Sequence, residues 1–436
     1  MTRRLYTHRT ATIAALTLAF VLMFVAVTPA SADTTLVDTA HPVLSDGAPE
    51  ASDMLGDTAH ASSTAPVDRS DRLASYSRFV NIWRIIRFVV GAGVLSLLLF
   101  TGLSARFRTW ASIARHQFAV TWLYAVIFLV AHYLLILPFS IYRRFVVETD
   151  YGFLNQTFWQ WWGDDLLNLA LELLLAVVPI WLLYFTIRKY RRWWLAFTIV
   201  MAPVIVLLVA VAPVFVSPMF NKFEPLKDEA LETEIRDLAV RAGIGDADIF
   251  QVDASRQSNR LNAYVTGVLG SERIVLYDTM IDNFTVDEIK FVMSHEIGHY
   301  VKRHIWWGLL VTVLFLGFAA WLTGRTIGSV IRRFRRQFGF DRLSDIASLP
   351  LLLLFASVIL FLFQPITNAA SREMERQADR FSMELSGASA ETATSAFEKL
   401  SSHNLSDPDP HPVIEFWFYT HPALKKRIAF VQGYRP

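Results

Sequence analysis

Cysteine is absent from this chain of 436 residues. Disulfide bonds, thiolate metal ligands and a cysteine nucleophile are therefore excluded, and thiols give no indication of the redox compartment. Charge is also sparse, because Asp, Glu, Lys and Arg make up 18% of the residues and leave a formal net charge of +2. This balance indicates no general attraction to nucleic acid. Any metal ion that the protein binds is expected to be held by histidine and carboxylate side chains.

Apolar residues are abundant instead, at 53% of the chain with a mean hydropathy of +0.36. This composition is too apolar for a soluble protein of such length and predicts several membrane spans. Six apolar stretches can cross a bilayer, at about 85–103, 118–138, 166–187, 194–216, 305–324 and 346–364. Glu172 lies within the third stretch, where it either faces an internal water-filled cavity or is hydrogen-bonded within the bundle.

The N-terminal residues are typical of a secretory signal. Three arginines precede an apolar run at 11–27, and Ala30-Ser31-Ala32 offers small residues suited to a signal peptidase. Residues 1–32 are therefore expected to be either a cleaved signal peptide or a first membrane helix. Residues 33–80 are expected to form a polar linker, of which 33–68 should be disordered and extracytoplasmic, since 33–68 contain seven acidic residues and no Lys or Arg. An N-terminal membrane domain of four spans should follow at 81–216.

The loops between the expected spans differ in charge. Residues 104–117 contain three arginines and no acid, 188–193 contain four basic residues, and 325–348 contain six arginines and two aspartates. The loop 139–165 contains two arginines and four acidic residues. Because basic loops tend to face the cytoplasm, the segment 217–304 is expected on the outer side of the membrane.

The polar segment 217–304 separates the fourth and fifth spans. We expect an amphipathic helix that begins at Pro225 and ends at Gly243, and no internal repeat is found. Short strands are expected at 249–252 and 274–277, with the segment 262–267 between them, closed by the turn residues Gly270-Ser271. Further helices are expected at 286–303, 366–386 and 390–402.

His295, Glu296 and His299 form the pattern His-Glu-x-x-His within the helix expected at 286–303. Positions i and i+4 of an α-helix share one face, so both imidazoles can bind one metal ion. Glu296 would then accept a proton from a water held at the open position of the metal. The alternative is a helix that carries two incidental histidines.

Two histidines leave a zinc site incomplete, and Glu375 is the best candidate for a third ligand. Glu375 and Asp379 are i and i+4 on one helix, so one can bind the metal while the other orients a ligating imidazole. Glu373 points about 160° away from Glu375 around the helix and fits less well. Two expected spans separate His299 from Glu375, so both residues reach the same side of the membrane. The alternative is a charged, solvated helix.

Several other histidines need a role. His421, which precedes a proline, could donate a hydrogen bond to the oxyanion of a tetrahedral intermediate. His304 is expected to cap or line the site rather than to bind the metal. His403 and His411 are expected on the surface.

Together these residues resemble the type I CAAX prenyl endopeptidases, a family of integral-membrane zinc metalloproteases. The resemblance extends from about Phe145 to the C-terminus, and the motifs follow the order and spacing of the family. The motifs are 151–157, 218–226, Asn262-Ala263-Tyr264, 273–279, 295–299, 371–372 with Glu375, Ala378-Asp379 and His421-Pro422.

The resemblance implies a gluzincin core, in which one zinc ion is held by His295, His299 and Glu375. It also implies that Glu296 is the general base and that Asp379 supports the zinc ligands from behind. The strand Asn262-Ala263-Tyr264 is implied to bind the substrate backbone, and His421 to lie near the scissile carbonyl.

The fold implied by the resemblance is mainly α. It is a polytopic membrane helix bundle that encloses a chamber, with a small α+β gluzincin zinc-peptidase domain. This domain would occupy 217–436 and include the spans 305–324 and 346–364. The family chamber is walled by seven membrane helices, a number that this chain reaches if its N-terminal segment is counted.

The expected function is hydrolysis of membrane-associated, lipid-modified or misfolded proteins by a membrane-embedded zinc endopeptidase. The expected location is a bacterial cytoplasmic membrane, where prenylated substrates are not expected. The outer placement of 217–304 also differs from the usual cytosolic active site of the family. Two other functions are considered: a non-proteolytic membrane holdase that uses the same chamber, and a transporter.

Overall fold

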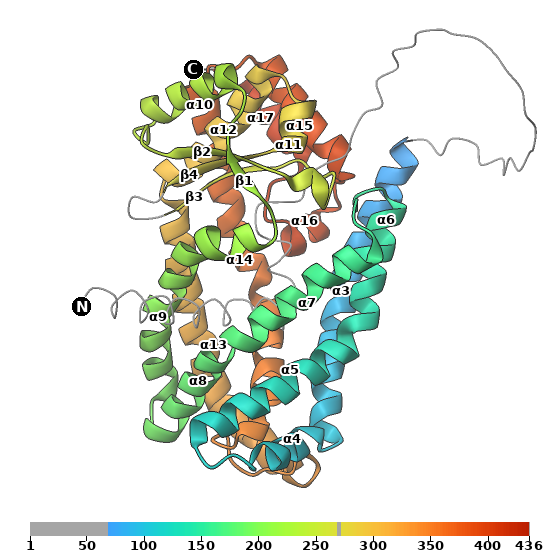
Figure 1. Ribbon diagram of the computed structural model, residues 1–436, viewed down its shortest axis with the longest axis vertical. Helices are drawn as coiled ribbons and strands as arrows, with labels where there is room; N and C mark the ends of the chain where they lie inside the picture. The colour runs from blue at the N-terminus through green and yellow to red at the C-terminus, as the bar shows by residue number, and fades with distance from the viewer. Residues whose placement is uncertain (1–68, 268–271, 436) are drawn as a thin grey trace, which may run out of the picture.

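The computed structural model describes residues 69–267 and 272–435, which form an elongated molecule with a small sheet near one end (Figure 1). The expected signal segment 1–32 and the linker as far as residue 68 lie outside the described residues. The last part of the expected linker, 69–80, is helical, because the first described helix begins at Arg69.

The first half of the described chain is helical. In chain order its elements are α3 (Arg69–Phe100), α4 (Leu103–Ala111), α5 (Gln117–Ile141), the π-helical η1 (Tyr142–Val147), α6 (Glu148–Asp150), α7 (Phe158–Leu175), α8 (Val177–Lys189), α9 (Trp193–Val211), the π-helical η2 (Ala212–Val216) and the 3-10 turn η3 (Ser217–Met219).

The second half mixes strands and helices. Its elements are β1 (Phe223–Pro225), α10 (Glu229–Arg241), β2 (Asp248–Val252), η4 (Ala254–Arg256), β3 (Ala263–Thr266), β4 (Arg273–Tyr277), α11 (Asp278–Asn283), α12 (Val286–Val301), α13 (His304–Phe338), η5 (Ile346–Ser348), α14 (Leu349–Ser386), α15 (Ala390–Asn404), α16 (Pro412–Phe418) and α17 (Leu424–Gly433).

Six helical stretches of the described chain are long and apolar enough to cross a membrane. They are Asp71–Phe100, Gln117–Asp150, Phe158–Lys189, Trp193–Met219, His304–Phe338 and Ile346–Ser386. Their order follows the six predicted spans, but the helices are longer than the apolar runs. The expected loop 325–348 is largely helical, since α13 continues to Phe338 and ends at Gly339, whose φ is 72°. Likewise, the expected sixth span and the helix after it are one helix, α14.

The membrane helices pack through an apolar core and leave other apolar side chains facing outward. Leu95, Phe128 and Ile180 are fully buried, whereas Leu314 and Ile366 are more than 60% exposed. Exposed aliphatic side chains cost little where lipid tails replace water. This distribution fits a bundle surrounded by a bilayer.

The three basic segments meet at the end of the molecule that lies far from the sheet (Figure 1). Arg108 forms an ion pair with Asp345 and donates to the carbonyl oxygen of Gly339 at 3.4 Å. Arg188 donates to the carbonyl oxygen of Ser344 at 3.2 Å and to Gln117 at 3.0 Å. Segments that are far apart in the sequence therefore form one basic end.

The four-stranded sheet has the order β1-β2-β4-β3. β2 and β4 are parallel, and β1 and β3 each run antiparallel to their one neighbour. β3 therefore lies at an edge of this sheet, with Ala263 opposite Leu276. Helix α10 begins at Glu229 rather than at Pro225, because Pro225 belongs to β1 and Asp228 caps the helix.

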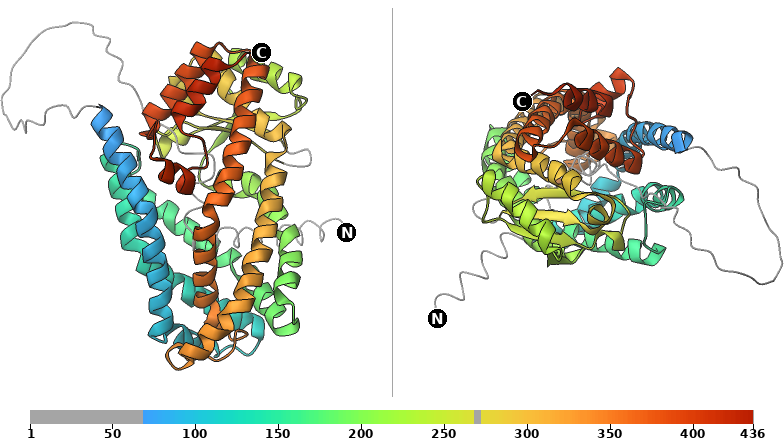
Figure 2. Two further views of the ribbon diagram at one scale, coloured as in Figure 1. Left: turned by 180° about the vertical axis from the view of Figure 1, so that it is seen from behind. Right: turned by 90° about the horizontal axis from the view of Figure 1, so that it is seen from above.

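The sheet and helices α10–α12 and α15–α17 lie together at one end, and the long helices α13 and α14 run from there to the basic end (Figures 1 and 2). This small α+β unit on a membrane helix bundle confirms the predicted fold class.

Candidate metal centre

The metal-binding motif lies on α12, whose start is fixed by its own side chains. The Thr285 hydroxyl accepts from the backbone N–H of Glu288, and Glu288 Oε2 accepts from the backbone N–H of Thr285 at 2.8 Å. This capping box satisfies two backbone donors at the helix start. From Phe291 to Gly298 every residue of α12 is buried, so the motif enters the protein interior.

Gly298 lets α12 lie close to α14. A Cβ atom at this position would lie 3.0 Å from Cδ1 of Phe381, which is closer than side chains normally approach. The short separation brings Glu375 and Asp379, both buried on α14, against the two histidines of the motif.

His295, His299 and Glu375 form a group of side chains able to hold a metal ion. The two Nε2 atoms lie 3.0 Å apart, His295 Nε2 is 3.3 Å from Glu375 Oε2, and His299 Nε2 is 3.3 Å from Glu375 Oε1. Ligands about 2.0–2.2 Å from a tetrahedral zinc ion lie about 3.3–3.6 Å apart, so the two imidazole–carboxylate separations match one such ion, while the two Nε2 atoms lie slightly closer than that geometry requires.

The donor set also fits a cation for a second reason. Glu375 Oε2 is buried and accepts no well-formed hydrogen bond among the described residues, and its cationic neighbours are His295 Nε2 at 3.3 Å and Arg427 Nη2 at 3.8 Å. A carboxylate oxygen without a well-formed hydrogen bond is costly in the protein interior, and a divalent cation between Glu375 and the imidazoles would compensate it.

Asp379 lies behind His295. Its Oδ1 is 2.9 Å from His295 Nδ1, which leaves Nε2 for the metal. Arg427 of α17 binds both Asp379 oxygens, from Nη2 at 2.5 Å and from Nε at 2.9 Å. Burial opposes a charged His295, but the hydrogen bonds and charges of Asp379 and Glu375 outweigh it and raise the pKa of His295 to about 10, so a metal ion that binds Nε2 must displace a proton.

Arg427 was missed by the sequence reasoning. It is the last residue of a Lys425-Lys426-Arg427 run that reads as a solvated helix face, yet its side chain is only 14% exposed. Its guanidinium also lies over the ring of Phe397, 4.3 Å from the centroid. One feature of the sequence could have indicated its role: Arg427 lies six residues after His421, within the C-terminal segment that resembles the family.

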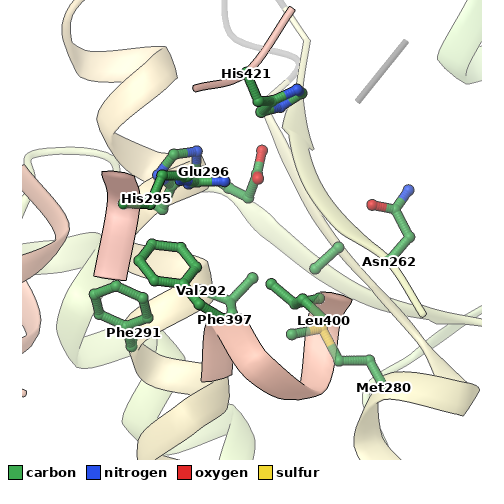
Figure 3. A pocket seen from close by; sticks show the side chains of 11 residues that line it. Asn262, Met280, Phe291, Val292, His295, Glu296, Phe397, Leu400 and His421 are labelled. Atoms are coloured by element: carbon green, nitrogen blue, oxygen red, sulfur yellow. The ribbon is translucent and has the colours of Figure 1, made fainter. Parts of the chain in front are cut away.

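Glu296 and His421 line the same pocket as His295 (Figure 3). Burial raises the pKa of Glu296, although the two imidazoles oppose that shift. Burial lowers the pKa of His421, which favours the neutral imidazole. His421 Nε2 lies 3.3 Å from Glu375 Oε1, so His421 reaches the candidate metal centre from the turn before α17.

Asn262 and Ala263 line this pocket at the start of β3. Asn262 Nδ2 is buried and without a hydrogen-bond partner among the described residues. Tyr264 is not among the lining residues. Because strand side chains alternate between faces, its ring instead packs near Tyr277, with 6.4 Å between centroids.

The floor of the pocket is apolar. It is formed by Met280, Phe291, Val292, Phe397 and Leu400.

The other histidines and Glu373 lie at the site, in the protein interior or on the surface. His304 touches the site, with Nδ1 2.9 Å from His299 Nδ1. Glu373 is exposed and paired with Arg376, which removes it from the ligand set as predicted. His403 is only 2% exposed, so its predicted surface position is wrong, because α15 packs it inward. His411 is exposed and caps α16.

Two family descriptions match this chain. Residues 225–435 match Peptidase family M48, and residues 63–222 match the CAAX prenyl protease N-terminal region with five membrane helices.

Similar proteins occur in bacteria and in eukaryotes. An uncharacterized metalloprotease, YhfN, of Bacillus subtilis (strain 168) is 31% identical over 359 residues, which cover 82% of this chain and 84% of that protein. The CAAX prenyl protease 1 homolog of Arabidopsis thaliana is 32% identical over 307 residues, which cover 68% of this chain and 70% of the plant protein.

A solved structure shares the fold. The crystal structure of S. mikatae Ste24p superposes with a TM-score of 0.69 at 24% sequence identity, and the match covers 96% of this chain and 98% of that one.

Proposed function

The chain belongs to peptidase family M48 and is a membrane metalloprotease, and from this premise we propose that it is a zinc endopeptidase. The observation that carries the proposal is the convergence of His295, His299 and Glu375 beside the buried Glu296. We further propose a division at residue 216, between a membrane domain and a peptidase domain that includes two spans.

The proposed reaction is hydrolysis of a peptide bond. Zinc held by the two histidines and Glu375 would polarise the scissile carbonyl and lower the pKa of a water molecule. Glu296 takes one proton from the attacking water and later transfers it to the leaving amine, so the base is regenerated. His421 donates a hydrogen bond to the carbonyl oxygen as that oxygen gains negative charge. Asp379 and Arg427 hold the orientation of His295.

Substrate binding is proposed at the free edge of β3. Among the described strands β3 pairs only with β4, so its other edge can receive an extended peptide through main-chain hydrogen bonds. Asn262 Nδ2 offers an additional donor. Ala263 and Tyr264 would contribute backbone groups. The apolar floor of the pocket would receive an apolar side chain next to the scissile bond.

The proposed substrates are membrane-associated proteins, lipid-modified or misfolded, that reach the site through a chamber between the membrane helices. Similarity to proteins named CAAX prenyl protease favours lipid-modified substrates. The exposed apolar residues of the bundle fit a protein embedded in a bacterial cytoplasmic membrane.

The active site is proposed to face the outer side of that membrane. Arg108 and Arg188 belong to segments that meet at the end far from the sheet, and clustered positive charge favours the cytoplasm. The peptidase unit at the opposite end would then lie outside.

The alternative of a non-proteolytic holdase is not favoured, because binding alone gives no use for a buried Glu296 beside a metal centre. A transporter is disfavoured for the same reason. Zinc content and peptide cleavage, measured together for the wild type and Glu296→Gln, separate these functions. We expect zinc in both proteins and cleavage only by the wild type. Zinc in both proteins with equal cleavage would contradict the role of Glu296, and a metal-free wild type would contradict the zinc site.

A further inference from the structure

Glu148 is a nearly buried carboxylate that the proposed mechanism does not use. Its side chain is 12% exposed and lies where the membrane helices meet the peptidase unit. Tyr76 of α3 donates to Oε1 at 2.8 Å, Arg143 pairs with the same oxygen, and Arg260 donates to Oε2 at 2.6 Å. Three segments far apart in the sequence thus converge on one carboxylate. A carboxylate can be kept charged here because two arginines compensate it.

Aromatic packing holds Arg260 in this position. Its guanidinium lies over the ring of Phe153, 4.3 Å from the centroid. Phe153 is fully buried and its ring lies 4.9 Å from that of Tyr76. Arg260 also donates to the Tyr76 hydroxyl at 2.8 Å. The arrangement combines charge pairing, stacking and hydrogen bonding, and is therefore more rigid than an exposed ion pair.

Backbone pairing continues the contact. The N–H of Asn155 donates to the carbonyl of Gln257 at 3.0 Å, and the N–H of Asn259 donates to the carbonyl of Phe153 at 3.2 Å. Leu154 and Ser258 form an isolated antiparallel bridge. The motif 151–157, which the sequence singled out and the mechanism leaves unused, therefore lies along the chain that leads into β3.

The substrate strand begins directly after this contact. Only Leu261, which is fully buried, separates Arg260 from Asn262. The carbonyl of Arg260 accepts from Thr279 Oγ1 at 2.8 Å, and the carbonyl of Asn262 accepts from the N–H of Tyr277 at 3.0 Å. Arg260 and Asn262 are thus both held by hydrogen bonds, and a displacement of Arg260 would also displace Asn262, whose side-chain amide faces the pocket.

We propose that Tyr76, Glu148 and Arg260 form a clamp through which the membrane helices position β3 for substrate. These three residues, called here the Glu148 clamp, are positioning residues and do not touch the reacting atoms. The inference rests on the proposed function in one respect, which is that β3 binds the substrate backbone.

The clamp should affect peptide binding much more than metal binding. The zinc ligands lie on α12 and α14, whereas the clamp connects to β3. Displacement of β3 would misalign the main-chain hydrogen bonds that hold an extended peptide, and these bonds act on the bound substrate and on the transition state alike. Loss of the clamp should therefore raise KM for a peptide that pairs with β3 and leave zinc content unchanged.

Two variants test the clamp. Arg260→Gln removes the charge that compensates Glu148, and Tyr76→Phe is milder, since it removes one hydroxyl and keeps the ring. The matched control is Arg236→Gln on α10, where Arg236 pairs with Glu232 at 2.7 Å away from β3. Full-length protein in detergent is used, with zinc content, thermal unfolding and kcat and KM for one peptide measured in parallel.

Each clamp variant is expected to retain full zinc and to lower kcat/KM about tenfold or more, mainly through KM, while the control stays at the wild-type value. If Arg260→Gln fails to fold, Tyr76→Phe alone decides. Unchanged KM in a folded clamp variant overturns the proposal. Loss of zinc in parallel with loss of activity also overturns it, because that pattern indicates a general structural role.

A second assay separates the clamp from the proposed function. The dissociation constant of a fluorescent peptide is measured in the Glu296→Gln background, where turnover is not needed. Acetohydroxamate, a small zinc chelator, serves as the comparison ligand. A roughly tenfold weaker peptide affinity with unchanged acetohydroxamate affinity supports the clamp, even if the wild type cleaves nothing. Equal weakening of the peptide and acetohydroxamate affinities, or no change in either affinity, overturns the proposal.

Discussion

His304 Nδ1 lies 2.9 Å from His299 Nδ1, while Nε2 of the same His299 ring is 3.3 Å from Glu375 Oε1. His304 thus contacts the imidazole on the side opposite the candidate metal position. The contact depends on a sharp break between α12 and α13 at Arg303, whose φ is 58°. A residue other than glycine in the left-handed conformation costs roughly 1–3 kcal/mol, so the turn forms against the local backbone preference of Arg303.

His304→Ala is expected to weaken zinc binding about tenfold to a hundredfold, because the partner that orients His299 is lost. Zinc affinity is measured by competition with a chelating dye. The control is His116→Ala, which removes an exposed histidine at the start of α5 that makes no side-chain cap. Equal affinities for wild type and His304→Ala would show that His304 only fills space.

Removal of zinc is expected to lower the thermal stability of the protein. Metal bound to the folded state at a thousand times its dissociation constant stabilises that state by about 4 kcal/mol. Unfolding temperatures are measured after dialysis against a chelator and during titration with zinc. Glu375→Ala is the comparison, since it removes one of the three candidate ligands. A melting temperature that ignores zinc in the wild type would contradict the metal centre.

The sequence predicted the six spans and brought His295, His299 and Glu375 together through i, i+4 spacing and an even number of crossings. Apolar runs located the spans but underestimated α13, because its last turns carry arginines that stay helical beyond the apolar core. Local propensity also misplaced the start of α10, because proline is common at the first position of a helix, whereas Pro225 pairs with Phe250 in the sheet.

Long-range partners could not be predicted. Arg427 lies 48 residues beyond Asp379, and nothing in a basic run indicates that one member is buried. His403 was misplaced for a similar reason, since burial is set by how α15 packs. The Glu148 clamp joins residues separated by up to 184 positions, as between Tyr76 and Arg260, and only the fold brings them together.

The contribution of Glu288, at the start of α12, to the stability of the protein should depend on pH. Glu288 Oε2 accepts from Lys399 Nζ at 2.7 Å and Oε1 accepts from Ser395 at 2.6 Å. Burial opposes the charged carboxylate, but the hydrogen bonds from Lys399 and Ser395 outweigh it and lower the pKa of Glu288. The stability that results is present above the ordinary pKa of glutamate and is lost as the pH falls through the lowered value.

Lys399→Met is therefore expected to lower the free energy of unfolding by about 1–2 kcal/mol at neutral pH. The difference from the wild type should shrink on acidification, as Glu288 becomes protonated in both proteins. The difference is measured by thermal unfolding in detergent, from neutral pH down to values below the ordinary pKa of glutamate. Lys425→Met, which breaks an exposed pair with Asp409, should change stability by less than about 0.5 kcal/mol. A pH-independent difference would refute the assignment.

The absence of cysteine makes the orientation in the membrane directly testable, because each introduced cysteine is the only thiol. Asp246→Cys places one on the exposed surface of the peptidase unit, and Ser112→Cys places one in a basic segment at the other end. In intact bacterial cells a membrane-impermeant maleimide should label Cys only at position 246, because the basic end faces the cytoplasm. Permeabilised cells should label both variants, and the cysteine-free parent should remain unlabelled throughout. Labelling at position 112 alone in intact cells would place the active site in the cytoplasm instead.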